Sequence, residues 1–218
     1  GKHYNFTYAP VASWTTIRLI LTIAAMFKWP TRQLDYVLAF PQAPIERELY
    51  MKIPKGYEVQ QGKTSDHVLK LKNNLYGQKQ AGRVWNRYLI NKLKSIGFEQ
   101  SEHDECVLYR GKVIYVLYTD DSIITAPTNA LIQAAINDIK TTGLHMTDEG
   151  SIEDFLGVNI TYLKDGSIHF HQPHLIDQIL HDLNIQENTS TKEIPAKSSK
   201  ILSRHSSSSH HDNSFNYK

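Results

Sequence analysis

Two adjacent carboxylates inside an apolar stretch are the residues of this sequence best suited to chemistry. Asp120 and Asp121 end the tetrapeptide Tyr-Thr-Asp-Asp at 118–121, between the apolar runs Val113–Leu117 and Ile123–Ala126. Strands are depleted in Asp, so two flanking strands would leave both carboxylates at the tip of a hairpin, where a divalent cation could bind them. An ordinary turn also favours Asp, and the tetrapeptide alone leaves both interpretations open.

The elements that must position this hairpin are a mixture of helices and short strands. Lys-Asp-Gly at 164–166 predicts a second hairpin, so strand pairing is expected to be antiparallel. The expected class is therefore α+β, an antiparallel sheet backed by helices. Helices are expected over Ser13–Lys28, Ala81–Ile96, Thr128–Thr141 and Pro173–Leu183; strands are expected over Arg32–Ala39, Glu48–Lys52, His67–Leu71, Cys106–Tyr109, Val113–Tyr118, Ile123–Thr125, Phe155–Leu163 and Ser167–His171.

Composition favours a globular intracellular protein. The 218 residues are 40% hydrophobic and 21% charged, and Cys106 is the one cysteine, so no internal disulfide can form. Cys106 is expected in the core. The longest apolar stretch, Ile17–Phe27, is too short and too polar to span a bilayer, so no membrane partner is expected. We expect one domain over 1–185, and a Ser/His-rich tail over 186–218 that is disordered or begins a truncated next region.

A basic segment without acidic residues runs from His67 to Phe98. Such a segment is typical of a surface that binds a phosphate backbone. It also fits a solvated helix face whose counter-charges come from elsewhere in the chain. Its basic residues are Lys70, Lys72, Lys79, Arg83, Arg87, Lys92 and Lys94.

With these elements placed, the chain resembles the reverse transcriptase of copia-type retrotransposons, the palm region of the Pol polyprotein. The resemblance covers about residues 7–185, in which a series of blocks follows the family order. They are Tyr8–Val11 with Thr16–Arg18, Gln33–Asp35 through Ala39-Phe40, Leu49–Lys52 with Pro54 and Gly56-Tyr57, Leu75–Gly77 with Lys79–Ala81, Arg83 and Trp85, then Tyr118–Asp121, and Phe155–Gly157.

The resemblance implies RNA-directed DNA synthesis on a polymerase palm. A primer 3′-hydroxyl attacks the α-phosphate of a deoxynucleoside triphosphate, with two Mg²⁺ ions, or Mn²⁺ as a substitute, about 3.5–4 Å apart. The residues that match the catalytic metal ligands are Asp35, Asp120 and Asp121. An RNA template, a DNA primer, the nucleotide and the other Pol domains are the implied partners. A cytoplasmic virus-like particle, or the nucleus, is the implied location.

Further site residues follow from the same resemblance. Phe40 matches the aromatic that selects deoxynucleotides by excluding a 2′-hydroxyl; the less favoured alternative is a core residue. Gln80 and Arg83 match nucleotide-binding positions. Lys79, Arg87 and Tyr118 are expected to contact nucleic acid, whereas Trp85 and Tyr88 lie on the apolar helix stripe and are expected in the core. His169, His171 and His174 are a weaker metal-site hypothesis.

The sequence differs from the family pattern in ways that leave the metal ligands in place. Thr119 and Gly82 replace the usual Val and Pro. The chain is expected to begin after most of the fingers and to stop before the thumb and ribonuclease H regions. The alternative function is a catalytically inert retrotransposon remnant that only binds nucleic acid. A different palm-based nucleotidyl transferase would explain the carboxylates but not Phe40 or Lys79–Ala81.

Overall fold

A six-stranded antiparallel sheet organises most of the chain in this computed structural model, which describes residues 7–57, 62, 66–186 and 189. The strand order is β4-β5-β6-β7-β1-β8, and every neighbouring pair is antiparallel. The predicted tail 186–218 lies outside the described residues except at Gln186 and Thr189. The strands are β1 (Thr31–Tyr36), β4 (Glu99–Gln100), β5 (Val107–Arg110), β6 (Val113–Tyr118), β7 (Asp121–Thr125) and β8 (Met146–Gly150).

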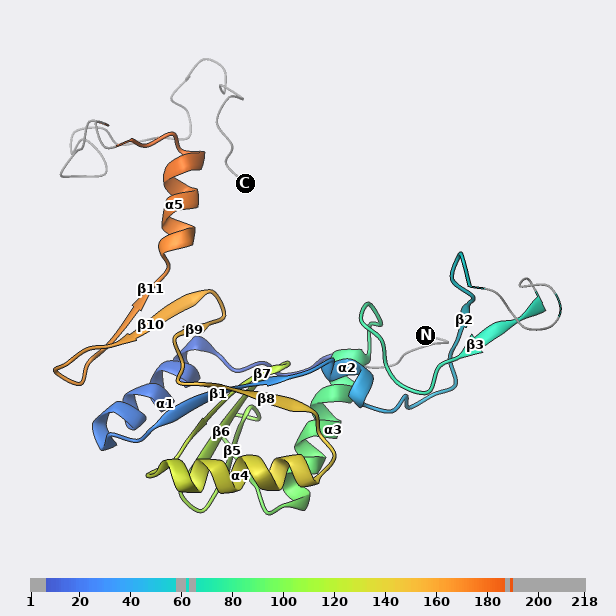
Figure 1. Ribbon diagram of the computed structural model, residues 1–218, viewed down its shortest axis with the longest axis horizontal. Helices are drawn as coiled ribbons and strands as arrows, with labels where there is room; N and C mark the ends of the chain where they lie inside the picture. The colour runs from blue at the N-terminus through green and yellow to red at the C-terminus, as the bar shows by residue number, and fades with distance from the viewer. Residues whose placement is uncertain (1–6, 58–61, 63–65, 187–188, 190–218) are drawn as a thin grey trace, which may run out of the picture. The chain divides into compact units, whose positions relative to one another are not determined.

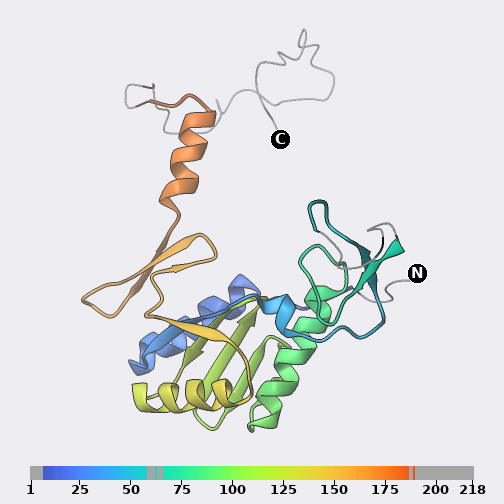
Figure 2. The ribbon, with the colours of Figure 1, turned by 45° about the vertical axis from the view of Figure 1, so that its right-hand side comes forward.

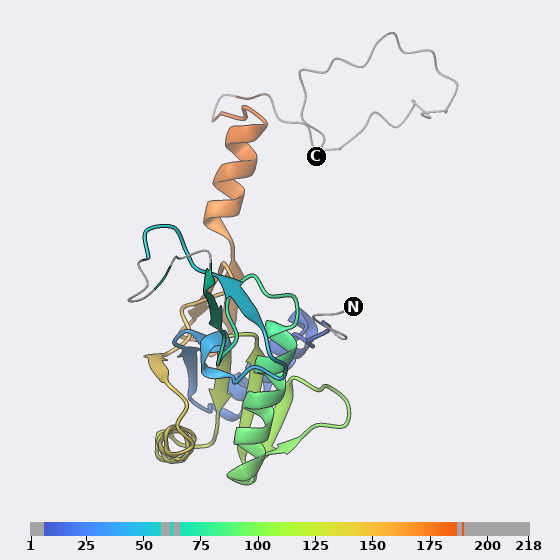
Figure 3. The ribbon, with the colours of Figure 1, turned by 90° about the vertical axis from the view of Figure 1, so that its right-hand side faces the viewer.

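Helices cover both faces of this sheet (Figures 1 and 2). α3 (Ala81–Ser95) and α4 (Asn129–Thr141) pack on one face in a core that includes Trp85, Leu93 and Ile139. Figure 3 views α4 end-on, with α3 beside it. α1 (Trp14–Phe27) packs on the other face, where Ile17 and Leu21 join Val116 and Ile123. The α+β class is thereby confirmed.

The predicted helix starts agree with the caps in the structure. The Ser13 hydroxyl accepts a hydrogen bond from the Thr16 N–H, and the Thr128 hydroxyl accepts one from the Leu131 N–H. A hydroxyl at this position satisfies an N–H that has no partner within the helix.

Cys106 is also in the core as predicted. It is buried, and burial followed by the charges of Asp104 and Glu105 raises the pKa of its thiol to about 12.

Smaller elements extend from the sheet. One is a two-stranded ribbon of β2 with β3, and another is a three-stranded sheet in the order β11-β10-β9. Helix α5 belongs to a separate unit, Pro173–Lys218, and is described by itself. No helix among the described residues is long and apolar enough to cross a membrane. The bounds are β2 (Tyr50–Lys52), β3 (Val68–Lys70), β9 (Asp154–Phe155), β10 (Val158–Tyr162), β11 (Ile168–His171) and α5 (Pro173–Asp182).

Two predicted strands were wrong in extent. The strand expected over Arg32–Ala39 ends at Tyr36, because Leu38 has φ 50° and begins the short helix α2 (Ala39–Gln42). A residue with this left-handed backbone conformation cannot continue a strand. The strand expected over Phe155–Leu163 is divided into β9 and β10 by Leu156 and Gly157, both with positive φ. β8, with the sequence Met-Thr-Asp-Glu-Gly, was not predicted, since it lacks an apolar alternation.

Candidate active site

The turn between β6 and β7 places Asp120 at the end of the sheet, as the tetrapeptide at 118–121 predicts. Tyr118 pairs with Asp121, so Thr119 and Asp120 form a two-residue loop. Thr119 has φ 54°, which is rare for a β-branched residue and costs conformational energy. Two donors hold the loop: the Trp85 Nε1–H lies 2.7 Å from the Thr119 carbonyl oxygen, and the Tyr36 N–H lies 3.0 Å from the Asp120 carbonyl oxygen.

Asp35 lies beside this turn through the pairing of β1 with β7. Its register partner is Asp121 on one side and Thr147 of β8 on the other. Directly paired residues project to the same face of a sheet, so Tyr118, Asp121, Asp35 and Thr147 form one row across four strands. This is the α1 face, since Ile123, two residues after Asp121, belongs to the α1 core. The structure therefore brings together residues that lie 86 positions apart in the chain.

The electrostatics of this row are those of crowded carboxylates. Burial, then the charges of Asp120 and Glu149, raise the pKa of Asp35. Burial, then the charges of Asp120 and Asp35, raise the pKa of Asp121, against a hydrogen bond from Gln33 that lowers it. The Gln33 Nε2 atom lies 3.5 Å from Asp121 Oδ1. Mutual repulsion of this kind favours either a proton or a cation at the site.

The donor set suits a hard cation, although it is not a closed coordination shell. Carboxylate oxygens are the ligands that Mg²⁺ prefers, and Mg²⁺ keeps several waters. Within the described part of the chain, no three His, Cys, Asp or Glu side chains are already gathered as a metal-binding group. This applies both to the carboxylates and to the described histidines. The rings of His169 and His171 stack on each other, with centroids 5.1 Å apart. The carboxylates interact electrostatically, and their side chains would have to converge around a cation.

Phe40 and Tyr76 form an aromatic pair, and the charges of Asp120 and Asp35 act on the tyrosine. Phe40, the second residue of α2, is partly buried against the core of α3 and α4. Its ring centroid lies 4.8 Å from that of Tyr76. Burial, then the charge of Asp120 and a weaker one from Asp35, raise the pKa of Tyr76, against a backbone hydrogen bond at Ala39 that lowers it. Tyr76 was not predicted as a site residue, although it lies within the Leu75–Gly77 block.

The predicted nucleotide and nucleic-acid residues near α3 lie immediately before it and in its first two turns. Gln80 is the N-cap residue and is half-buried, without a side-chain capping bond. Arg83 and Arg87 both contact Glu46: Arg83 Nη2 bonds Oε2, and Arg87 Nη1 lies 3.3 Å from Oε1. Lys79 is exposed at the start of the helix. Their predicted roles stay predictions, and Glu46 is an acidic partner that the sequence did not indicate.

The remaining aromatic predictions concern packing. Trp85 is fully buried and Tyr88 packs partly buried on the same core, so both are core residues as expected. Tyr118 packs partly buried against the α1 core, and its predicted contact with nucleic acid stays a prediction. The tryptophan also bonds to the Thr119 carbonyl, a supporting role that the helical stripe alone did not indicate.

Counter-charges and neutral acceptors contact much of the basic segment. Lys70, the last residue of β3, pairs with Glu48, which lies two residues before β2. Lys92 donates to the Thr142 carbonyl at 2.8 Å, and Lys94 donates to Gln100 Oε1 at 3.0 Å. Together with Glu46, these contacts agree in part with the solvated-face interpretation. The ribbon and α3 therefore present fewer uncompensated cations than the sequence alone suggested.

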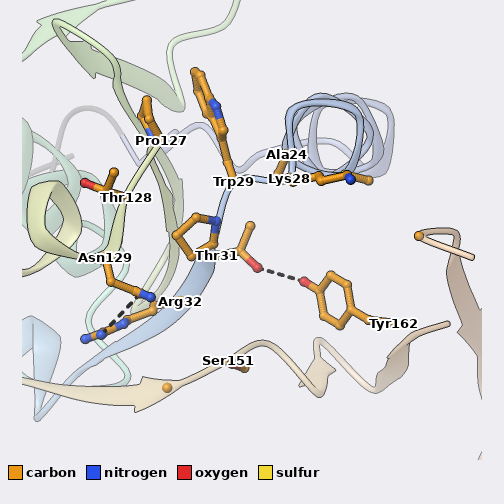
Figure 4. A pocket seen from close by; sticks show the side chains of 14 residues that line it. Ala24, Lys28, Trp29, Thr31, Arg32, Pro127, Thr128, Asn129, Ser151 and Tyr162 are labelled. Atoms are coloured by element: carbon orange, nitrogen blue, oxygen red, sulfur yellow. Dashed lines mark hydrogen bonds between the residues drawn. The ribbon is translucent and has the colours of Figure 1, made fainter. Parts of the chain in front are cut away.

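A cavity of about 800 Å³ lies at the other end of β1 from Asp35 (Figure 4). Its lining includes Lys28, Trp29 and Arg32, with a hydrogen bond of 2.7 Å between the Thr31 and Tyr162 hydroxyls. Arg32 is already paired with Asp148, at 2.6 Å. The first and fifth residues of β1 are about 13 Å apart at the usual rise of a strand, so this cavity is separate from the carboxylates.

Comparison with known proteins agrees with the geometry. The family model described as "Reverse transcriptase (RNA-dependent DNA polymerase)" matches residues 1–198. The chain is 34% identical to the Retrovirus-related Pol polyprotein from transposon RE1 of Arabidopsis thaliana, covering 85% of this chain and 13% of the relative. It is 31% identical to the Retrovirus-related Pol polyprotein from transposon TNT 1-94 of Nicotiana tabacum, covering 85% and 14%. No solved structure matches.

The matched region covers most of this chain but only a small part of each plant relative. The chain spans less than a sixth of either plant polyprotein. A shorter relative, the Putative transposon Ty5-1 protein YCL074W of Saccharomyces cerevisiae, is 30% identical over 62% of this chain and 44% of its own length. The family model covers most of the chain in one continuous stretch that contains every carboxylate of the site. The chain therefore belongs to the reverse transcriptase family, as a copia-type retrotransposon Pol region.

Proposed function

We propose that this chain supplies the palm of an RNA-directed DNA polymerase, with Asp35, Asp120 and Asp121 as the ligands of two Mg²⁺ ions. The observation that carries the proposal is the register of β1 and β7, which pairs Asp35 directly with Asp121 at the turn that presents Asp120. Rigid strands position a site more accurately than loops do. The raised pKa values of Asp35 and Asp121 support it, because repulsion between the carboxylates would be relieved by a cation.

Different residues of the chain would have different roles around the transferred phosphate. Bound Mg²⁺ or Mn²⁺ would activate the attacking primer oxygen and stabilise the departing pyrophosphate. The carboxylates of Asp35 and Asp120 would hold the ions, and Asp121 would complete the set. Phe40 would exclude a ribose 2′-hydroxyl by contact, because an apolar pocket rejects an added hydroxyl poorly unless it is sterically closed.

The basic residues of α3 would bind the phosphates of the substrates. Gln80 and Arg83 would contact the deoxynucleoside triphosphate, while Lys79, Arg87 and Tyr118 would contact the RNA template and DNA primer. Positioning supplies much of the rate in phosphoryl transfer, so this palm would act together with other segments of a Pol polyprotein. By the same family membership we propose a virus-like particle as its location.

The test is primer extension on an RNA template with Mg²⁺, in a Pol polyprotein that contains this chain. Asp120→Asn is expected to reduce extension at least about 10³-fold, because it removes charge where the ions bind. Asp177→Asn, a change of the same kind at an exposed residue of α5, is expected to leave extension unchanged. Equal extension by Asp120→Asn and the unchanged protein would contradict the role of the carboxylates. Salt-sensitive binding without any extension would favour the inert remnant.

A further inference from the structure

Two aromatic rings from separate segments, Phe40 and Tyr76, pack against each other. Phe40 belongs to α2, and Tyr76 belongs to the loop that leads into α3. Their centroids lie 4.8 Å apart at an interplanar angle of 39°. Tyr76 remains 54% exposed, so one side of its ring faces solvent or substrate while the other contacts Phe40. An exposed aromatic held against a second ring is unlike a core residue, and it needs a local explanation.

The backbone of this loop explains why Tyr76 stays against Phe40. The turn Leu75–Gln78 is closed twice, by the Gln78 N–H to the Leu75 carbonyl at 3.3 Å and by the Leu75 N–H to Gln78 Oε1 at 3.1 Å. Gly77, the third residue, has φ 89°, the conformation that a type II turn requires there. Tyr76 is therefore the second residue of a tight turn, where its backbone is fixed.

The loop is also tied to the segment that carries Phe40. Asn74 is fully buried, and its Nδ2 donates to the carbonyls of Ala43 and Pro44 at 3.0 and 3.1 Å. Asn73 Nδ2 donates to the Pro41 carbonyl at 2.6 Å. These bonds join residues 73–74 to the segment immediately after Phe40. These bonds help to hold the two rings together, although they lie 36 positions apart in the chain.

The charges of Asp120 and Asp35 both act on the Tyr76 phenol. Among the charges that act on it, Asp120 is the stronger and Asp35 the weaker, and its oxygen takes a backbone hydrogen bond at Ala39, the residue before Phe40. Tyr76 thus contacts the Phe40 ring and the backbone beside that ring, and it interacts electrostatically with Asp120 and Asp35. By contrast, Gln80, the residue expected near the sugar, makes no capping bond and lies one turn further along.

We propose that Tyr76 is a specificity-determining residue that holds the Phe40 ring against the sugar of the incoming nucleotide and so sets the rejection of ribonucleotides. The inference rests on the proposed function. Steric exclusion of one hydroxyl requires a rigidly held side chain, because a ring that can change rotamer would admit the larger sugar. Phe40 is supported on its core side by the sheet and α3, and Tyr76 supports its outer side.

The experiment compares dNTP and rNTP incorporation by a Pol polyprotein that contains this chain, as the ratio of kcat/KM values. Tyr76→Ala is expected to lower the deoxy-to-ribo ratio at least about tenfold, with a smaller loss in dNTP incorporation. Tyr76→Phe keeps the ring and should keep the ratio. Asn73→Ala loosens the same loop without changing either ring, so a smaller shift in the same direction is expected. Tyr109→Ala, at a 41% exposed tyrosine of β5, is the matched control.

A double variant tests whether the two rings act as one unit. Tyr76→Ala combined with Phe40→Ala should have about the ratio of Phe40→Ala alone, because the support is irrelevant once the Phe40 ring is absent. An unchanged ratio in Tyr76→Ala, or independent multiplicative losses in the double variant, would overturn the inference. Either result with normal dNTP extension leaves the proposed function standing, whereas the absence of extension in the unchanged protein overturns both.

Discussion

At the scale of single residues, the site consists of charges placed close together at a cost to stability. Asp35 and Asp121 are paired across two strands, with Asp120 at the adjoining turn. The pKa values of both Asp35 and Asp121 are raised, burial being the first cause and neighbouring charge the second. A folded state that holds its protons more tightly than the unfolded chain loses stability as the pH rises past the unfolded value. The carboxylates therefore destabilise the metal-free fold near neutral pH.

Asp121→Asn is predicted to stabilise the metal-free chain at pH 7. The pKa of Asp121 is raised above the ordinary aspartate value of 3.8, so the penalty grows from about that pH upwards and is complete above the pKa of the folded state. Because the residue is partly exposed, screening holds the gain to about 1 kcal/mol or less. That gain raises Tm by up to about 4 °C for a chain of this size. Thermal unfolding at pH 7 and pH 3.5, with chelator, measures it.

Asp165→Asn is the control with the opposite sign. Hydrogen bonds from Ser167 lower the pKa of Asp165, so its charged form stabilises the fold and that contribution is lost as the pH falls. The asparagine variant should therefore be no more stable than the unchanged chain at pH 7. A gain for Asp121→Asn that persists unchanged at pH 3.5 would show that the effect is not electrostatic.

At the scale of elements, α3 acts as the support of the hairpin turn. Trp85 is fully buried, its ring lies edge-on to Tyr36 at 5.2 Å, and its indole donates to the Thr119 carbonyl. Thr119 adopts a left-handed conformation that a β-branched residue avoids, so something outside the hairpin must hold it. The indole donor and the Tyr36 N–H are the two groups that do so.

Trp85→Phe is predicted to lower stability and extension together. It leaves the Thr119 carbonyl without its donor and removes buried volume, which costs about 1–3 kcal/mol. Circular dichroism in urea measures the loss, and primer extension by the polyprotein reports whether Asp120 is still positioned. Tyr88→Phe, on the same helix, should change the free energy of unfolding by less than about 1 kcal/mol. Equal stability of Trp85→Phe and the unchanged chain would exclude this support.

At the scale of the whole described chain, charge compensation limits the basic surface. The acid-free segment from His67 to Phe98 is strongly positive by sequence. Two acids that precede it in the chain, Glu46 and Glu48, form ion pairs with three of its cations. Both acids lie in the segment between α2 and β2, although the sequence predicted Glu48 as the first residue of a strand. Non-specific binding of nucleic acid depends on the number of phosphates that are neutralised, so these two acids are expected to weaken any such binding.

Glu46→Gln is predicted to increase affinity for an RNA–DNA duplex. It removes the carboxylate that Arg83 and Arg87 share, so the plot of log K against log salt should steepen by about 1–2 and affinity at low salt should rise several-fold. Fluorescence anisotropy at a series of salt concentrations measures both. Glu102→Gln, an exposed acid outside this cluster, is the control. If the two variants have the same salt slope, Glu46 does not restrain the arginines.

The sequence by itself determined the local elements and the identity of the chemical groups. Helix caps at Ser13 and Thr128, the hairpin around Thr119-Asp120 and the buried stripe with Trp85 follow from patterns within a few residues. Resemblance between spaced blocks identified the family, and it predicted the carboxylates as metal ligands. These features depend on local propensity and on residue type, which are properties of short segments.

Only the tertiary structure decided which distant residues meet. The pairing of Asp35 with Asp121, the contact of Tyr76 with Phe40, and the reach of Glu46 to α3 each join segments at least 36 residues apart. β8 was missed because its pairing with β1, rather than its own composition, makes it a strand. Such contacts arise from sheet register and loop hydrogen bonds over the whole fold, and no pattern within a short segment encodes them.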